Sequence, residues 1–470
     1  MDARYKRLGK NTIIVFLGTA GSKLIGLLML PYYTHYLSKA EYGSYDLINT
    51  YSLILLAFFT CCIADSIFVI PKNREESQKK SLFSSGFMFA GISMLIVASL
   101  AFLIRSFLPE GFLKLNIWWI FGLTYATFFS NYAQQFTRSI DKMMVYSLTG
   151  VVYVACIALL SFVLLPKYKL DGYLIALIAS AIFSFFFAII FSKAYKYIRI
   201  TCVDLASLKE LLKYGIPLIP NSIMWWIVDG INRPIMASKI GVEAIGLYAI
   251  ANKVPSLLSM LFVVFSNAWG ISMIEEFEKP GFNQFFNKTM QFLYFVVAIG
   301  ASLLILSSKF IIDIIASDAF FEAWYYVPVL TLGVIFQNMS SLVGGVFMAE
   351  RKSKHFFYSS LWGALTSLVM TLLLVNLFGL MGVCIAVALS FLCMTVSRVV
   401  YAWPHIRGFN IIYYSYMTLI LVIQAAIYIN INSFVLNIIV FLCCITIMLL
   451  LNKPFVVRII DKSKKIIIKK

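Results

Sequence analysis

Long apolar runs, separated by short polar stretches, repeat from one end of the chain to the other. About 20 apolar residues in a row are enough to cross the hydrocarbon core of a membrane as a helix. Strict alternation of apolar and polar residues is absent, so we expect helices and not barrel strands. The pattern predicts about fourteen spans, at residues 11–37, 42–70, 82–104, 115–137, 143–165, 172–192, 215–238, 244–274, 289–312, 324–349, 355–378, 382–402, 414–431 and 433–452.

The composition also predicts an all-α integral membrane protein. Of the 470 residues, 61% are hydrophobic and 13% are charged, which is too little charge to cover the surface of a soluble chain. The first apolar stretch is too long for the core of a signal peptide, so we expect a retained first helix. The eight cysteines lie mostly inside apolar runs without metal-type spacing, so we interpret them as buried hydrophobic residues.

The distribution of basic residues predicts the orientation. With the N-terminus inside, the inward segments hold 29 of the 39 Lys and Arg residues, the outward loops hold seven, and three lie within spans. This asymmetry predicts that both termini are cytoplasmic. It also explains the net charge of +18 without a nucleic-acid partner. The basic tail at 453–470 is expected to lie against anionic lipid headgroups.

Two alignments of the chain with itself predict an internal duplication. At an offset of 203 residues, the pairs are Pro31 with Pro234, Gly43 with Gly246, Tyr45 with Tyr248, and Asn49 with Asn252. At an offset of 210, KLDGYLIA (169–176) aligns with GLMGVCIA (379–386). Each repeat would hold six spans, an even number, so the two repeats are expected to be parallel in the membrane.

The duplication predicts the domain organisation. An N-terminal lobe at 1–198 and a C-terminal lobe at 215–402 are joined by a linker at 199–214, and two extra spans at 403–452 precede the tail. Within the linker, Leu205, Leu208, Leu211 and Leu212 share one helical face, which predicts an amphipathic cytoplasmic helix at the membrane interface. Two facing bundles around a central cavity are typical of alternating-access carriers.

Charged side chains within spans are costly, and each is therefore a candidate for function. Lys23 lies near the middle of the first span among small residues. It could bind phosphate as a fixed positive charge, or it could form a structural ion pair with Asp46 or Asp229.

Span 7 carries Asp229 and Arg233, four residues apart, with Asn232 between them. Residues at this spacing share a helical face. Arg233 could bind anionic headgroup oxygens while Asp229 orients it or carries a coupling proton; alternatively, the two form a self-neutralising pair. In span 8, Lys253 follows Asn252, and Lys253 is either a cavity cation or a lysine that snorkels to the surface or is paired.

No sequence motif indicates catalysis or a cofactor. The three histidines, His35, His355 and His405, are scattered near span ends, and there is no nucleophile elbow, HExxH motif, P-loop or dinucleotide fingerprint. The outward loops are also too short to hold a catalytic domain. We therefore expect a transporter and not an enzyme.

Two segments resemble polysaccharide flippases of the Wzx type, which share a superfamily with MATE drug exporters and lipid II flippases. These segments are GTAGSKLIGLLMLPYYTHYLSKAEYGSYDL (18–47) and LKELLKYGIPLIPNSIMWWIVDGINRPIMASKIGVEAIGLYAIANKV (208–254). The second holds D-x-x-x-R followed by G-x-Y-x-x-A-x-K, from Asp229 to Lys253. The resemblance covers spans 1–12 and implies a V-shaped, MATE-like fold of two six-helix lobes with two extra helices.

The resemblance also implies a function. The expected substrate is an undecaprenyl-pyrophosphate-linked oligosaccharide, such as an O-antigen or capsule repeat unit, moved from the inner to the outer leaflet of a bacterial cytoplasmic membrane. Lys23, Arg233 and Lys253 suit its pyrophosphate. Expected partners are this substrate, membrane lipids and other polysaccharide-assembly membrane proteins.

Three rival functions are distinguishable in part. A lipid II flippase shares the fourteen-span plan and a cationic cavity, so it stays an alternative. A MATE-type exporter of cationic drugs would be expected to carry a cavity carboxylate, often in the first span, where this chain has Lys23. An O-antigen polymerase would be expected to have a long outward loop, which this chain lacks.

Overall fold

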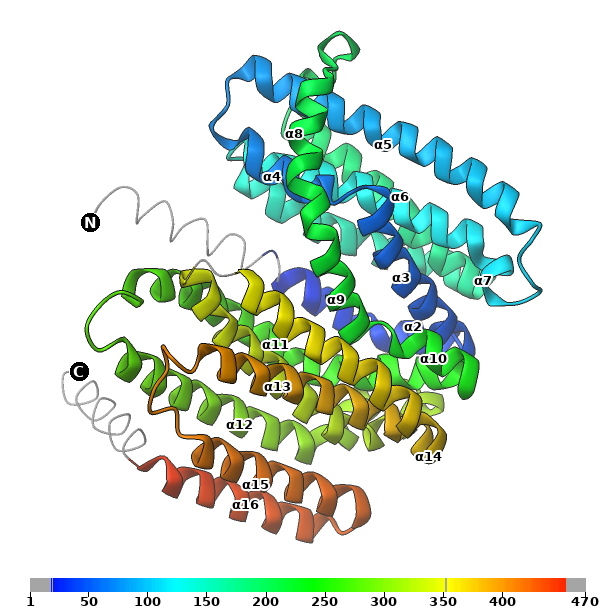
Figure 1. Cartoon of the computed structure of the whole chain (residues 1–470). Coiled ribbons are helices and arrows are strands. Elements are labelled where there is room, and N and C mark those ends of the chain that lie inside the picture. Colours follow the sequence, from blue (N-terminus) through cyan, green and yellow to red (C-terminus); the bar gives the residue numbers. More distant parts are fainter. Residues whose placement is uncertain (1–17, 19, 351–352, 454–470) are drawn as a thin grey trace, which may run out of the picture. The chain divides into compact units, whose positions relative to one another are not determined.

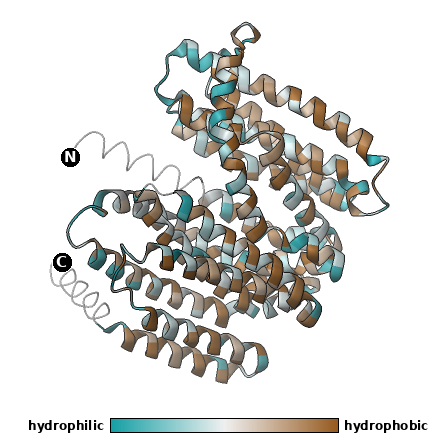
Figure 2. Ribbon diagram, in the orientation of Figure 1, coloured by the Kyte–Doolittle hydropathy of each residue, from teal (hydrophilic) through white to brown (hydrophobic). Residues whose placement is uncertain are grey.

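The computed structural model describes residue 18, residues 20–350 and residues 353–453, and all its regular elements in those ranges are helices. The predicted tail at 453–470 lies almost wholly outside them. The chain divides into two compact units, 1–226 and 227–470. This boundary falls inside the expected seventh span, later than the expected linker. Figure 2 shows hydrophobic residues along the helices and hydrophilic residues toward their ends and in the loops.

The first unit begins with helical residues 20–28 and continues through eight helices, the last of which crosses the boundary between the units. These are α2 (Leu30–Tyr36), α3 (Lys39–Phe59), α4 (Ile63–Val69), α5 (Glu76–Arg105), α6 (Phe112–Ser139), α7 (Met143–Phe191), α8 (Leu205–Gly215) and α9 (Ile219–Asp229), as labelled in Figure 1. Helix α5 exposes large apolar side chains such as Leu95 and Phe102, at 65% and 69%, as expected of a surface that faces lipid.

The second unit contains the remaining helices. These are α10 (Asn232–Lys239), α11 (Val242–Glu276), α12 (Phe282–Ile315), the 3₁₀ helix η5 (Asp318–Tyr325), α13 (Val327–Ala349), α14 (Ser353–Ala402), α15 (Ile411–Asn430) and α16 (Phe434–Leu451). Helix α13 packs against α11, α12, α14 and α15 and is buried along most of its length. It is therefore the central helix of this unit (Figure 1).

Among the described residues, seven helices have the length and apolar character of a membrane span, or eight if the bent pair α3 and α4 counts as one. Two of the seven, α7 and α14, are about twice the usual length and each covers two expected spans. The protein is therefore a multi-pass membrane protein, and the number of fourteen spans stays a prediction.

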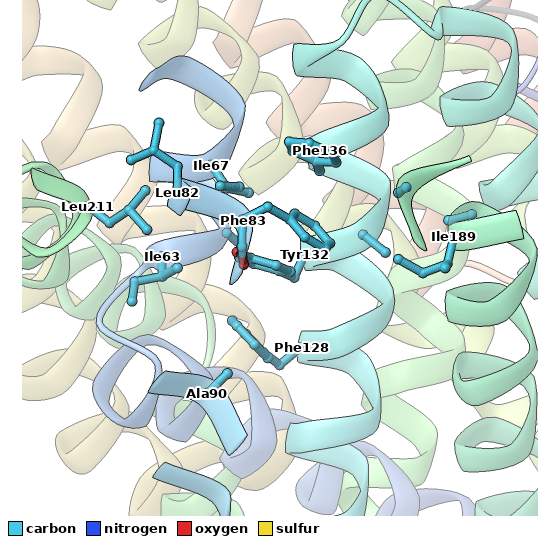
Figure 3. Packing of buried hydrophobic residues seen from close by; sticks show 14 residues of the cluster. Ile63, Ile67, Leu82, Phe83, Ala90, Phe128, Tyr132, Phe136, Ile189 and Leu211 are labelled. Atoms are coloured by element: carbon cyan, nitrogen blue, oxygen red, sulfur yellow. Dashed lines mark hydrogen bonds between the residues drawn. The ribbon is translucent and has the colours of Figure 1, made fainter. Parts of the chain in front are cut away.

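The core of the first unit joins residues that are distant in the sequence. Phe83 on α5 packs against Tyr132 and Phe136 on α6, with ring centroids 5.1 and 4.3 Å apart, and the Tyr132 hydroxyl donates to the Phe83 carbonyl at 2.8 Å. Ile63, Ile67 and Leu211 close this cluster (Figure 3).

The expected linker helix forms as α8, and most of its apolar face is covered by protein. Leu211 is fully buried in the core cluster, and Leu208 and Leu212 pack against it. Only Leu205, at 78% exposed, points outward. Hydrogen bonds from Ser66 to the Leu211 carbonyl and between the hydroxyls of Ser81 and Ser207 fix α8 on the first unit.

Candidate functional site

The expected seventh span is broken in its middle. Helix α9 ends at Asp229, and α10 begins at Asn232 after a two-residue turn. Pro234 lies in the first turn of α10, where the missing N–H group costs no hydrogen bond. A broken helix leaves backbone carbonyls at one end and amides at the other, and transporters use such ends to bind substrates and ions.

Arg233 bridges the two helices at this break. Its side chain is buried, and its Nη1 donates to the Asp229 carbonyl and, at 3.2 Å, to Asn232 Oδ1. The guanidinium carbon lies 5.0 Å from the ring centroid of Tyr248 on α11, and Asn232 Nδ2 donates to the Tyr248 hydroxyl at 3.4 Å. The cation therefore satisfies the negative C-terminal end of α9.

The turn between α9 and α10 interrupts the helix between Asp229 and Arg233. Arg233 bonds to the backbone carbonyl of Asp229, and the carboxylate side chain is exposed. Asp229 is consequently accessible, whereas the guanidinium is held in place.

The predicted residues of span 8 lie on the helix that holds Tyr248. Asn252 comes one turn after Tyr248 and is half-buried, and Lys253 is exposed. Positions four apart lie on the same helical face, so Asn252 and Tyr248 continue one polar stripe along α11. The structure thus brings together Asn232, Arg233 and Tyr248, with Asn252 one turn farther along the helix.

In the first unit, Lys23 lies on helical residues 20–28 and is exposed. Among the described residues of its own unit, no carboxylate forms an ion pair with it. A side chain added at Gly21 or Gly26 would meet nothing within 4 Å, whereas one added at Gly18 would overlap Ser147, so only part of the run of small residues around Lys23 borders open space. Asp46 on α3 is half-buried, and its carbonyl accepts a hydrogen bond from Thr50 at 2.7 Å.

Arg398 is a buried cation that the sequence reasoning missed. It lies within the expected span 382–402, yet the charge count placed it with the cytoplasmic segments. The structure buries it completely on α14, where it donates to the Ser340 carbonyl at 2.7 Å and to the hydroxyls of Ser359 and Ser360 at 3.2 and 3.3 Å. Phe356 packs on its guanidinium at 4.4 Å. The position of Arg398 deep in an apolar run could have identified it as a buried charge.

The second unit also contains an apolar cavity of about 720 Å³ between α12, α13, α14 and α15. Its wall is almost entirely hydrocarbon, with polar groups only at a few positions such as Tyr294, Thr395 and Thr418. Ring-bearing side chains of Trp403 and Phe409, from the segment between α14 and α15, form part of the lining. Such a space suits a hydrocarbon chain better than a polar solute.

The first and seventh spans differ where their repeats correspond. In the first span the helix continues through Met29, whose backbone angles are helical and whose N–H donates to the Ile25 carbonyl while its carbonyl accepts from Tyr33. In the seventh span the turn at 230–231 separates α9 from α10.

The family described as "Polysaccharide biosynthesis protein" matches residues 8–269, which is more than half of the chain. No curated protein sequence matches.

Solved structures share the fold. The lipid II flippase MurJ in an inward closed conformation has a TM-score of 0.70 at 16% identity, with 96% of this chain and 99% of that chain covered. An inward-facing multidrug resistance MATE transporter has a TM-score of 0.63 at 13% identity, with coverage of 91% and 99%. A MOP superfamily transporter from Pyrococcus furiosus has a TM-score of 0.56 at 13% identity, with coverage of 90% and 96%.

The structural matches confirm the predicted fold class. The sequence match covers the first unit and the α9–α11 region that holds Arg233, and the structural matches extend over most of the chain. This chain is a member of the polysaccharide biosynthesis protein family, with the helical membrane fold that MurJ and the MATE transporters share.

Proposed function

We propose that the protein is a flippase that moves an undecaprenyl-pyrophosphate-linked oligosaccharide from the inner to the outer leaflet of the bacterial cytoplasmic membrane by alternating access. The observation that carries this proposal is the family match over residues 8–269. The fold supports it, because MurJ, which has the same architecture, is named a lipid II flippase.

The intraspan cations would bind the anionic end of the substrate. Lys23 is exposed beside open space, and Arg233 is held at the α9–α10 break. Each of these cations, like Lys253, would attract the pyrophosphate, and Asn232 and Asn252 would serve as hydrogen-bonding partners. Asp229 and Asp46 would orient these cations or carry a coupling proton.

The apolar cavity of the second unit would accommodate part of the hydrocarbon tail. Its lining comes from α12 to α15 and is almost free of polar groups, so transfer of an isoprenoid chain into it would cost little desolvation of protein. Helix α15, one of the two helices beyond the predicted repeats, supplies Tyr414, Thr418 and Val422. This assigns a role to the thirteenth expected span.

Two other transport functions are alternatives to this proposal. A lipid II flippase would use the same cations, since its substrate is also a pyrophosphate-linked lipid. A MATE-type drug antiporter is disfavoured, because the exposed charge in the middle of the first span is the cation Lys23. We further propose that both termini are cytoplasmic, that the protein is not an enzyme, and that it works beside other polysaccharide-assembly membrane proteins.

A gene deletion in the native host tests this proposal. The expected result is accumulation of lipid-linked oligosaccharide and loss of surface glycan, both rescued by the wild-type gene and not by Lys23→Ala. Lys114→Ala is the matched control, because Lys114 pairs with Glu110 at the end of a helix. If the deletion strain keeps its surface glycan and becomes sensitive to cationic drugs, the flippase assignment is wrong and the protein is a drug exporter.

A further inference from the structure

A short connection between α7 and α8 exposes interspersed apolar and basic side chains. We call residues 193–205 the α7–α8 connection; they lie in the first unit, where α8 begins (Figure 1). Ile200 and Leu205 are 80% and 78% exposed. Lys196 and Arg199 are exposed as well. The first unit therefore presents both kinds of side chain on one short segment.

Two neighbouring serines of α5 hold this connection in place. The Ser84 hydroxyl donates to the Tyr197 carbonyl at 2.7 Å and accepts from the Arg199 amide at 2.9 Å. The Ser85 hydroxyl makes the same pair of bonds with the carbonyl and amide of Asp204, at 3.0 and 2.9 Å. Both serine side chains are buried, so these bonds are shielded from water. The exposed side chains therefore extend from a fixed backbone.

Positive charge dominates the α7–α8 connection. It carries Lys193, Lys196 and Arg199 against one acid, Asp204. The Asp204 carboxylate accepts hydrogen bonds at 3.2 and 3.0 Å from two amides in the first turn of α8, as an N-cap. Glu76 on α5, which bonds to Tyr197, is also paired with a lysine of its own helix at 2.9 Å. The exposed charge of the connection therefore favours an anionic partner.

The connection begins where a membrane span ends. The last residues of α7 expose their apolar side chains, Ile190 by 57% and Phe191 by 63%, as expected of a surface that faces lipid. Lys193 follows two residues later. Residues this close to the end of a span lie at the level of the lipid headgroups. Apolar side chains beside basic ones suit that level, because the first enter the acyl boundary and the second meet phosphates.

We propose that the α7–α8 connection binds the anionic lipid surface of the membrane beside α7. Ile200 and Leu205 enter the apolar edge of the headgroup layer, and Lys196 and Arg199 bind lipid phosphates. The serine bonds transmit this contact to α5, and α8 is held at the membrane because it begins within the connection. The contact does not depend on the molecule that the protein transports.

Photo-crosslinking of the full-length protein in vesicles tests this contact. The vesicles would contain equal amounts of phosphatidylcholine and phosphatidylglycerol, with a photoactivatable trace of one lipid or the other, and labelled peptides would be identified by mass spectrometry. The peptide that covers 193–205 should be labelled at least about fivefold more by the phosphatidylglycerol probe, as expected of basic side chains at an anionic surface. High salt should lower this ratio, because it screens exposed charges.

Three variants separate the charge from the apolar contact. The double variant Lys196→Gln with Arg199→Gln should lower the labelling ratio to about one. Arg105→Gln, at the exposed far end of α5, is the matched control and should leave the ratio unchanged. Ile200→Ser should reduce labelling by both probes. All these side chains are exposed, so we expect each variant to fold, as checked by its thermal unfolding midpoint.

Two results would overturn the proposal. The first is equal labelling of the wild-type peptide by both probes, or a preference for phosphatidylglycerol that persists in the double variant. The second is the absence of lipid labelling at 193–205 while the apolar end of α7 is labelled, which would show that the connection stands clear of the membrane.

Discussion

Lys169 and Gly379 adopt nearly the same non-helical backbone conformation, with φ/ψ of 45°/−123° and 55°/−132°. Each closes a helical hairpin, α7 in the first unit and α14 in the second, and the two positions are 210 residues apart, as the internal alignment requires. A likeness at the level of single backbone angles supports the duplication more directly than sequence identity in so apolar a chain.

Lys169 should carry strain that its counterpart avoids. A positive φ suits glycine and disfavours residues with a Cβ atom. We predict that Lys169→Gly raises the free energy of unfolding by about 1 kcal/mol, measured as an increase in the thermal unfolding midpoint. Lys167→Gly, at a neighbouring helical position, should instead lower it by about 1 kcal/mol. A decrease for both variants would show that Lys169 is unstrained.

The arms of each hairpin approach closely at a glycine. A Cβ atom at Gly172 would lie 2.5 Å from the Leu164 carbonyl oxygen, and one at Gly382 would overlap the Leu374 carbonyl. We predict that Gly382→Ala lowers stability by about 2 kcal/mol, again measured by thermal unfolding. Gly91→Ala on α5 is the control, because nothing lies within 4 Å of the added atom, and it should be neutral or slightly stabilising.

Replacement of Arg398 should lower the stability of the protein, although Arg398 is not part of the proposed site. Arg398→Lys keeps a buried charge but cannot reproduce the three hydrogen bonds to Ser340, Ser359 and Ser360. We predict a loss of about 1–3 kcal/mol in unfolding free energy. The exposed Arg407→Lys should change stability little, and equal thermal midpoints for the two variants would mean that the buried hydrogen bonds contribute nothing.

The sequence predicted the repeats, the hairpins and the intraspan cations because each leaves a local signal. It did not predict the 62° bend between α3 and α4 inside the expected second span. No proline or glycine marks that bend, where Cys61 and Cys62 have positive φ. Contacts with a distant segment accompany it, since Gly215 packs against the Cys61 carbonyl and Ser66 bonds to the Leu211 carbonyl.

The sequence identified candidate residues of the site but did not predict how they are arranged. Arg233 stood out as a charge in an apolar run, but its hydrogen bond to the Asp229 carbonyl depends on the break after Asp229, which the sequence did not predict. Arg398 was misassigned because a count by segment ignores depth. The apolar cavity depends on the packing of four helices, which no local pattern reveals.

Arg233 and Lys23 should respond differently to charge-conserving replacement. Arg233→Lys loses the two-partner contact with Asp229 and Asn232, so we predict at least a tenfold loss of transport. Lys23→Arg keeps an exposed cation beside open space and should retain most activity. Transport is measured as the amount of lipid-linked oligosaccharide that accumulates in cell extracts. Full activity of Arg233→Lys would show that any positive charge at the α9–α10 break supports transport.

The most direct test of the flippase assignment is transport by the purified protein in proteoliposomes. Undecaprenyl-pyrophosphate-linked oligosaccharide would be placed in both leaflets, and its exposure to an external glycan-modifying enzyme would be followed over time. The account predicts that wild-type protein makes the protected pool accessible, and that Lys23→Ala and empty liposomes do not. If the protected pool stays inaccessible while the same vesicles move a cationic dye, the flippase assignment is contradicted.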